Sequence, residues 1–215
     1  MHKSINNLVL IQNELKSNSE KETYPEIIAV SKTFSMKKIQ PLIDHGHFHF
    51  GENKVQEAVN KWSNIYNSQK NIKLHMIGKL QTNKVKFAVP LFDYIHSLDN
   101  FKLAQKISSE QIKHKKSLKI FIQVNIGNET NKSGIAPENL EVFYNQCVDK
   151  LNLNIIGLMC IPPKNDCEFY FNEMQHLNNK LNLNELSMGM SADYLTSIKY
   201  GSTFVRIGSK IFGDR

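Results

Sequence analysis

Short apolar segments recur along the chain, and each is followed by a longer stretch whose apolar residues lie three or four positions apart. The first pair is the apolar run at 26–32 and the amphipathic stretch at 35–46. Such runs predict buried strands, and the longer period predicts helices. Eight strands are predicted in this way, at residues 26–32, 47–53, 73–78, 93–98, 118–125, 153–159, 185–189 and 203–208.

Eight strands that alternate with helices in 215 residues indicate an α/β protein, a single (β/α)8 barrel of the TIM type. The rival fold is a doubly wound open sheet, but no G-x-G-x-x-G motif follows the first strand. No linker rich in Gly, Pro or Ser divides the chain. We therefore expect one domain over residues 1–215, with residues 1–20 as a peripheral N-terminal helix.

Composition and charge agree with a soluble cytoplasmic protein. No apolar run is long enough to span a membrane, and the N-terminus lacks the features of a signal peptide. Three cysteines without a C-x-x-C pair indicate reduced thiols. The net charge of +7 comes from scattered lysines in 1–150 without interleaved aromatic residues, so we expect a solvated surface and no binding to nucleic acid.

Unusual residues cluster where the predicted strands end, which is the functional face of such a barrel. Lys32 follows the apolar first strand, and Asn53 follows the second. The last two strands end in the segments "SMGMSAD" (187–193) and "RIGS" (206–209). Serine hydroxyls and backbone N–H groups in these two loops, next to the start of a helix, form the usual phosphate site of this fold.

Each residue of these loops also has a plainer interpretation. Ser191 could simply be the cap of its helix, and Gly208 could simply allow a turn of the chain, without any contact to a ligand. Both loops together, in this order, favour a phosphate site. A phosphate on one side and Lys32 on the other suggest pyridoxal phosphate, held as a Schiff base by a lysine that reacts as the neutral amine. Arg206 could face the pyridine nitrogen or could pair with a carboxylate of the barrel, and spacing alone leaves both open.

A metal-dependent hydrolase is a further alternative, because "HGHFHF" (45–50) contains an H-x-H pattern on a predicted strand. His47 and His49 come before the tip of that strand, however. His75 and His96 are likewise set back from the tips of theirs, whereas a barrel holds its metal at the mouth. We therefore expect no metal site.

Seven motifs resemble those of one known family, in the family's order and over residue 26 to the end of the chain. They are "AVSKTF", "HFGENKVQEA", "HMIGKLQTNK", "VNIGNETNKSGI", "GLMCIPP", "LSMGMSADY" and "GSTFVRIGSKIFGDR". The chain thus resembles the YggS/PROSC-type pyridoxal phosphate homeostasis proteins. The resemblance implies a fold similar to the N-terminal barrel of alanine racemase, and a carrier or regulator of free cofactor without established catalysis.

The resemblance also assigns roles by position. Lys32 would form the aldimine with pyridoxal phosphate, Asn53 would lie beside the ring, and Arg206 would face the pyridine nitrogen. The residues assigned to the phosphate are Ser187, Met190, Ser191, Gly208 and Ser209. Lys132, in "NKSGI", matches a lysine implicated in cofactor release.

The remaining alternative is a racemase-like enzyme that uses the same cofactor. Two-base racemisation needs a second acid or base opposite the lysine, and in alanine racemase a second domain supplies it. Because the chain ends soon after the last predicted strand, we expect that domain to be absent and the protein to be a monomer. Its expected partners are pyridoxal phosphate and, as recipients, enzymes that lack it.

Overall fold

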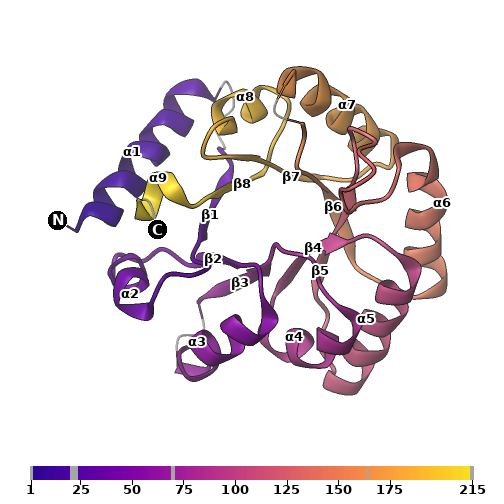
Figure 1. Cartoon of the computed structure of the whole chain (residues 1–215), viewed down its shortest axis with the longest axis horizontal. Helices are drawn as coiled ribbons and strands as arrows, with labels where there is room; N and C mark the ends of the chain where they lie inside the picture. Colours follow the sequence, from indigo (N-terminus) through magenta and orange to yellow (C-terminus); the bar gives the residue numbers. More distant parts are fainter. Residues whose placement is uncertain (1, 20–23, 69–70, 164, 214–215) are drawn as a thin grey trace.

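The strands of the computed structural model, which describes residues 2–19, 24–68, 71–163 and 165–213, close into one parallel barrel. Each strand pairs with the next in the chain, and the last pairs with the first (Figure 1). The predicted (β/α)8 barrel is therefore confirmed. In the described residues its strands are β1 (Glu26–Val30), β2 (His49–Glu52), β3 (Lys73–Met76), β4 (Tyr94–Leu98), β5 (Lys119–Val124), β6 (Ile155–Cys160), β7 (Glu185–Met190) and β8 (Phe204–Ile207).

Helices surround the barrel on its outside (Figure 1). They are α1 (Lys3–Asn18), α2 (Met36–Asp44), α3 (Val55–Ser68), α4 (Val85–Leu91), α5 (Phe101–His114), α6 (Leu140–Asn145), α7 (Cys167–Lys180), α8 (Tyr194–Lys199) and α9 (Ser209–Phe212). The amphipathic stretch at 137–151 is not one uniform helix. It begins as a 3-10 turn at Pro137–Asn139 and ends as a π-helical turn at Gln146–Lys150.

Apolar side chains fill the barrel and the layer between strands and helices. Inside the barrel, Ile28, Phe121 and Met159 are fully buried. On the outside, strand residues pack against helical ones such as Trp62 and Phe171, which are also fully buried. Burial on both faces explains why a strand such as β1 reads as a continuous apolar run without polar alternation.

The N-terminal helix α1 packs against α2, α8 and α9. Its apolar side chains Leu8, Ile11 and Leu15 are buried at helical spacing, whereas Leu10 is 60% exposed. The side-chain amide of Asn7 also donates a hydrogen bond to the carbonyl oxygen of Ile211 in α9, at 3.0 Å. The helix therefore belongs to the outer layer of the barrel, and its polar residues form the exposed face.

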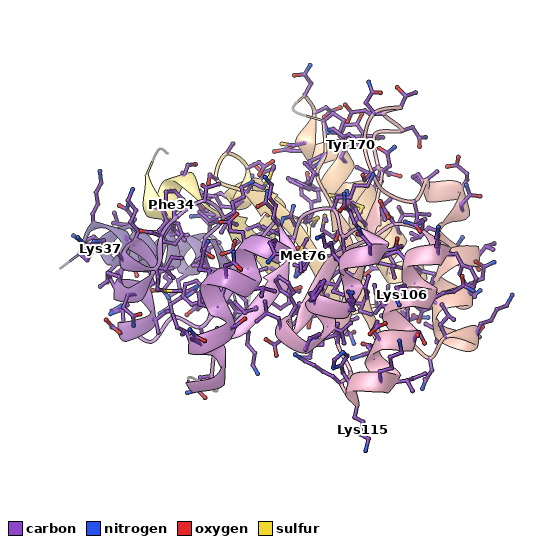
Figure 2. All side chains as sticks on the ribbon, turned by 60° about the horizontal axis from the view of Figure 1, so that its bottom comes forward. Phe34, Lys37, Met76, Lys106, Lys115 and Tyr170 are labelled. Carbon is purple, nitrogen blue, oxygen red and sulfur yellow. The ribbon has the colours of Figure 1, made fainter. Side chains whose placement is uncertain are left out.

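Charged side chains project from the outside of the molecule, as Lys37 and Lys115 do in Figure 2. By contrast, Met76 on β3 is buried. No helix in the described part of the chain combines the length and the apolar character that crossing a membrane requires.

We predict that Leu15→Ala lowers the free energy of unfolding by about 2–5 kcal/mol, because it leaves a cavity under α1. Leu10→Ala, on the exposed face of the same helix, is the matched control and is expected to change it by less than about 0.5 kcal/mol. Urea unfolding followed by circular dichroism measures both. Equal effects of the two substitutions would contradict the docking of α1.

Candidate functional site

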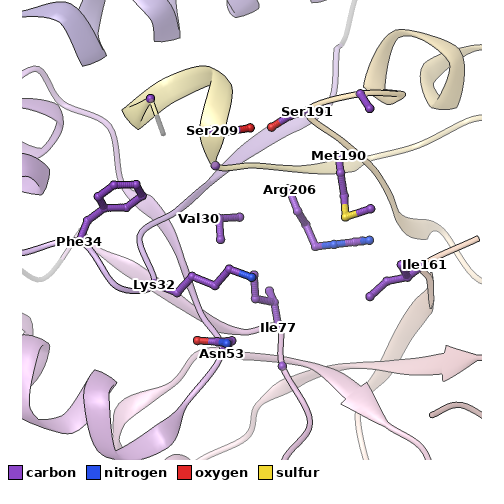
Figure 3. Close-up of a pocket in the computed structure, with 14 residues that line it drawn as sticks. Val30, Lys32, Phe34, Asn53, Ile77, Ile161, Met190, Ser191, Arg206 and Ser209 are labelled. Atoms are coloured by element: carbon purple, nitrogen blue, oxygen red, sulfur yellow. The ribbon is translucent and has the colours of Figure 1, made fainter. Parts of the chain in front are cut away.

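A cavity of about 730 Å³ opens at the carboxyl ends of the strands. Seven of the eight residues predicted for the site lie on its wall, namely Lys32, Asn53, Met190, Ser191, Arg206, Gly208 and Ser209. Figure 3 shows Lys32, from the turn after β1, and Arg206, from β8, extending into it, with Ser191 and Ser209 at one side. Strand ends far apart in the sequence thus meet in one place, as the barrel fold requires.

Lys32 lies in a tight turn directly after β1. Its neighbour Thr33 has a φ of 67°, in the left-handed region that β-branched residues rarely adopt. The backbone N–H of Thr33 donates a hydrogen bond of 2.5 Å to Oε1 of Glu57 on α3. This contact holds the turn in an unusual conformation and thereby directs the half-buried Lys32 side chain toward the cavity.

A buried cluster of polar side chains supports this turn from below. Glu52, at the end of β2, is fully buried, and its Oε1 accepts hydrogen bonds from Ser31 Oγ, Lys61 Nζ and Trp62 Nε1 at 2.7, 2.9 and 3.0 Å. Lys61 also donates to the carbonyl oxygen of Ser31 and to Glu57, both at 2.9 Å. The cluster ties the end of β1 to β2 and α3, so it fixes the position of Lys32.

Arg206 is buried and makes hydrogen bonds to neutral oxygen atoms. Its guanidinium donates to the carbonyl and hydroxyl oxygens of Ser187, at 2.6 and 2.7 Å, and to the carbonyl oxygen of Cys160 at 2.8 Å. Burial lowers the pKa of Arg206. Among the described residues no carboxylate lies within ion-pair distance of this side chain, so the alternative of a carboxylate partner is not what the structure shows.

Asn53 and the loop after β7 complete the wall of the cavity. Oδ1 of Asn53 is buried and has no hydrogen-bond partner in the described part of the protein. The N–H of Met190, the last residue of β7, donates to Oδ1 of Asp193 in this loop at 2.6 Å, just before α8 begins at Tyr194. Ser191 therefore does not occupy the position that precedes this helix, and the plainer interpretation of Ser191 as its cap is wrong.

Ser187 and Lys132 are not on the wall of the cavity. Ser187 is fully buried beneath Arg206, and its hydroxyl lies 2.9 Å from Nδ1 of His96. Lys132 forms an ion pair with Glu129 in the loop between β5 and α6. The structure thus does not bring Ser187 to the place where its predicted role requires it, because β7 turns this side chain into the barrel interior.

Seven lining residues escaped the sequence-based prediction: Val30, Phe34, Ile77, Gly78, Ile161, Ala192 and Gly213. Gly78 and Ile161 lie just after strands, at the functional face of the barrel, so their position in the sequence was enough to identify them as lining residues. Phe34 and Gly213 reach the cavity through the irregular turns that follow β1 and α9, and no local pattern marks them.

Three of the four histidines of the metal hypothesis lie inside the barrel rather than at its mouth, and His47 lies before β2 in the lining of a cavity at the amino-terminal ends of the strands. His49, His75 and His96 are buried and form hydrogen bonds with one another at 2.8 and 2.9 Å. Burial is the main reason that the pKa of His49 falls to about 4. No group of three or more potential metal ligands occurs in the described residues.

Comparison with known proteins gives consistent matches. The family model "Alanine racemase, N-terminal domain" matches residues 6–215. A pyridoxal phosphate homeostasis protein of Aquifex aeolicus (strain VF5) is 36% identical over 215 residues, which cover 95% of this chain and 93% of that protein. The structure of PipY of Synechococcus elongatus PCC7942, with PLP bound, has a TM-score of 0.87 at 30% identity, and the match covers 98% of this chain and 100% of PipY.

Alanine racemase of Clostridium difficile 630 shares the fold, with a TM-score of 0.75 at 13% identity. The match covers 98% of this chain but 57% of the racemase. At this level of sequence identity, the likeness shows only that the two proteins share the barrel fold.

We predict that Lys61→Met lowers the free energy of unfolding by about 3–5 kcal/mol, because it leaves the buried carboxylate of Glu52 without its cation. The double variant Lys61→Met/Glu52→Gln is expected to recover part of this loss, since the unpaired charge is gone. Lys37→Met, at an exposed position, is the control. Urea unfolding of the original protein, of Lys61→Met, of Glu52→Gln and of the double variant measures the coupling, and strictly additive effects would contradict it.

We also predict that the protein loses stability as the pH falls from 6.5 to about 4. Because the pKa of His49 is lowered in the folded state, the unfolded chain binds the proton more tightly, and unfolding takes up protons in this range. A shift from 6.5 to about 4 corresponds to roughly 3 kcal/mol for this one group. Urea unfolding at a series of pH values should show a smaller loss for His49→Asn. The exposed His176→Asn variant should match the original protein.

Proposed function

The chain belongs to the alanine racemase N-terminal domain family and, within it, to the pyridoxal phosphate homeostasis proteins; on this premise we propose that it binds pyridoxal phosphate reversibly through Lys32 and takes part in the homeostasis of this cofactor. One observation carries the proposal. A single cavity contains Lys32, the buried Arg206 and the two loops that follow β7 and β8. These are the groups that the aldehyde, the ring nitrogen and the phosphate of this cofactor require.

The residues of the cavity fit such a ligand. Its volume of about 730 Å³ lies within the usual range of ligand sites. Asn53 offers a buried amide whose Oδ1 has no partner among the described residues, so a polar ligand group beside it would complete its hydrogen bonding. Ser191 and Ser209 offer hydroxyls at the side of the cavity away from Asn53 (Figure 3). These three residues would hold the ring and the phosphate.

When bound, pyridoxal phosphate supplies an aldehyde that a neutral lysine amine attacks with loss of one water, and the reverse reaction with water regenerates the amine and the aldehyde. The role of the chain is to hold the Lys32 amine in the cavity. The contacts of Thr33 with Glu57 and of Ser31 with Glu52 do this by fixing the turn. Lys32 is the residue that we propose to bind the cofactor covalently.

Arg206 favours holding the cofactor over catalysing reactions with it. A guanidinium only donates hydrogen bonds, so a ring nitrogen beside it stays unprotonated and withdraws electrons weakly. Among the described residues that line the cavity, Lys32 and Arg206 are the only ionisable ones. A racemase needs a second acid or base opposite the lysine, and this lining offers none. Both points support a carrier without catalytic turnover over the racemase-like alternative.

We further propose that the protein acts in the cytoplasm, as a monomer, and hands the cofactor to enzymes that lack it. The shape of the site supports the hand-over to such enzymes. The cavity opens at the mouth of the barrel, where a bound molecule remains accessible to water or to the amine of an acceptor.

The test is the visible absorption spectrum of the purified protein after addition of pyridoxal phosphate. We expect an absorption band of lysine-bound cofactor that Lys32→Ala abolishes. Lys54→Ala, an exposed position near the mouth, is expected to leave the band unchanged. Borohydride should fix the cofactor onto the peptide that contains Lys32.

Two results would contradict the proposal. A protein that takes up no pyridoxal phosphate would exclude the binding function, and label on a lysine other than Lys32 would exclude the anchor. Rapid racemisation or transamination of added amino acids by the loaded protein would instead favour the alternative of a racemase-like enzyme.

A further inference from the structure

A chain of hydrogen bonds crosses the interior of the barrel, and neither the cavity nor the proposed function accounts for it. Its members, here called the interior relay, are His49, His75, His96 and Ser187, on β2, β3, β4 and β7. His49 Nδ1 lies 2.8 Å from His75 Nε2, and His75 Nδ1 lies 2.9 Å from His96 Nε2. His96 Nδ1 lies 2.9 Å from Ser187 Oγ. The same pair of atom types, Nδ1 to Nε2, meets at both contacts between histidines.

The two ends of the interior relay lie in different surroundings. At the upper end, Ser187 Oγ accepts a hydrogen bond of 2.7 Å from Arg206, whose side chain lines the mouth cavity. At the lower end, His49 Nε2 lies 3.8 Å from a carboxylate oxygen of Glu26, whose side chain is 57% exposed. Glu26 and His49 line a second cavity, of about 500 Å³, at the amino-terminal ends of the strands. The relay therefore extends from the base of the barrel to the guanidinium at its mouth.

The three imidazoles are neutral. Burial lowers the pKa of His75 and of His96 well below 6.5. Neighbouring cations add to this effect, and they include Arg206 beside His96 and Lys119 near His75 and His49. Aromatic rings cover their faces, with Tyr94 stacked on His75 at 4.1 Å and Phe121 on His96 at 4.3 Å between ring centroids. A neutral imidazole has one donor and one acceptor, so a row of them can point in either of two directions.

Both ends select the same direction. Arg206 is only a donor, so Ser187 Oγ accepts from it, and the hydroxyl proton of Ser187 is left to be donated. His96 Nδ1 is the one further partner of that hydroxyl in the described residues, so this nitrogen is the acceptor. The proton of His96 is then on Nε2, and the same holds in turn for His75 and His49. At the base, the Nε2–H of His49 faces the carboxylate of Glu26, whereas the opposite direction would place a lone pair there.

We propose that the interior relay is a hydrogen-bond chain of fixed direction that positions Arg206 through Ser187. Donation by Ser187 to His96 makes the serine oxygen a stronger acceptor, because hydrogen bonds in series polarise one another. This oxygen and the carbonyl of Cys160 hold the guanidinium in one orientation at the cavity wall. His49, His75 and His96 are thus positioning residues. That the oriented guanidinium meets a pyridine nitrogen rests on the proposed function.

The direction is tested on the ligand-free protein by the ¹⁵N chemical shifts of its histidine side chains. We expect His49, His75 and His96 to be neutral at pH 7 with their proton on Nε2. A dominant Nδ1–H form, or a protonated ring, at any of the three would overturn the proposal. This measurement needs no variant and no cofactor.

The positioning role is tested by a matched pair of substitutions at His96. His96→Phe keeps a ring against Phe121 but removes the acceptor of the Ser187 hydroxyl, whereas His96→Asn shortens the side chain but keeps an acceptor at the place of Nδ1. We expect the guanidinium protons of Arg206 to exchange with water on the order of tenfold faster in His96→Phe, the loss of about one hydrogen bond. Exchange in His96→Asn should stay close to that of the original protein.

A role in packing alone predicts the opposite order, with Phe tolerated and Asn disruptive, and that result would overturn the proposal. Ser202→Ala is the control for a buried serine outside the relay, since Ser202 bonds to the carbonyl of Met188 instead. If the tautomers and the exchange rates match these expectations while the protein takes up no pyridoxal phosphate, the interior relay is supported and the proposed function alone fails.

Discussion

The pairing of β8 with β1 is the interaction on which the site depends. It closes the barrel and sets Ile28 opposite Arg206 and Ala29 opposite Ile207. With this register, Gly208 lies beside Val30, where an added Cβ would approach the Val30 Cβ to 3.4 Å. The turn with Lys32 and the loop with Ser209 therefore leave the barrel next to each other. A slip of one residue would turn the side chain of Arg206 away from the interior.

Near the pairing of β8 with β1, two buried charges are stabilised in different ways. Glu52 is paired with Lys61 and receives two further hydrogen bonds, so its carboxylate is part of a rigid support. Arg206 has only neutral acceptors among the described residues, so its charge remains available to the cavity. A buried ion pair contributes little net stability compared with apolar packing, but it defines a unique geometry. Here that geometry is the direction in which Lys32 points.

Much of this could be predicted from the sequence. The eight strands followed from apolar runs such as 26–32, because a strand buried on both faces has no polar alternation. Lys32 and Arg206 followed from their places near strand ends. Ser187 shows where such reasoning stops. Its position within "SMGMSAD" suggested the phosphate loop, but the alternation of side chains along β7 sends its hydroxyl inward. The contacts among His49, His75 and His96 depend on the stagger of three strands, which no single segment encodes.

The distance along the chain between Lys32 and Ser209 has a thermodynamic consequence. These two residues lie near opposite ends of the sequence, and they share a cavity only when β8 has joined β1. A molecule that contacts both can bind only to the closed barrel, so occupancy of the cavity is coupled to completion of folding. Contacts of such long sequence range form at a high entropic cost. A molecule bound there would therefore stabilise the pairing of β8 with β1, and its loss would lower the free energy of unfolding.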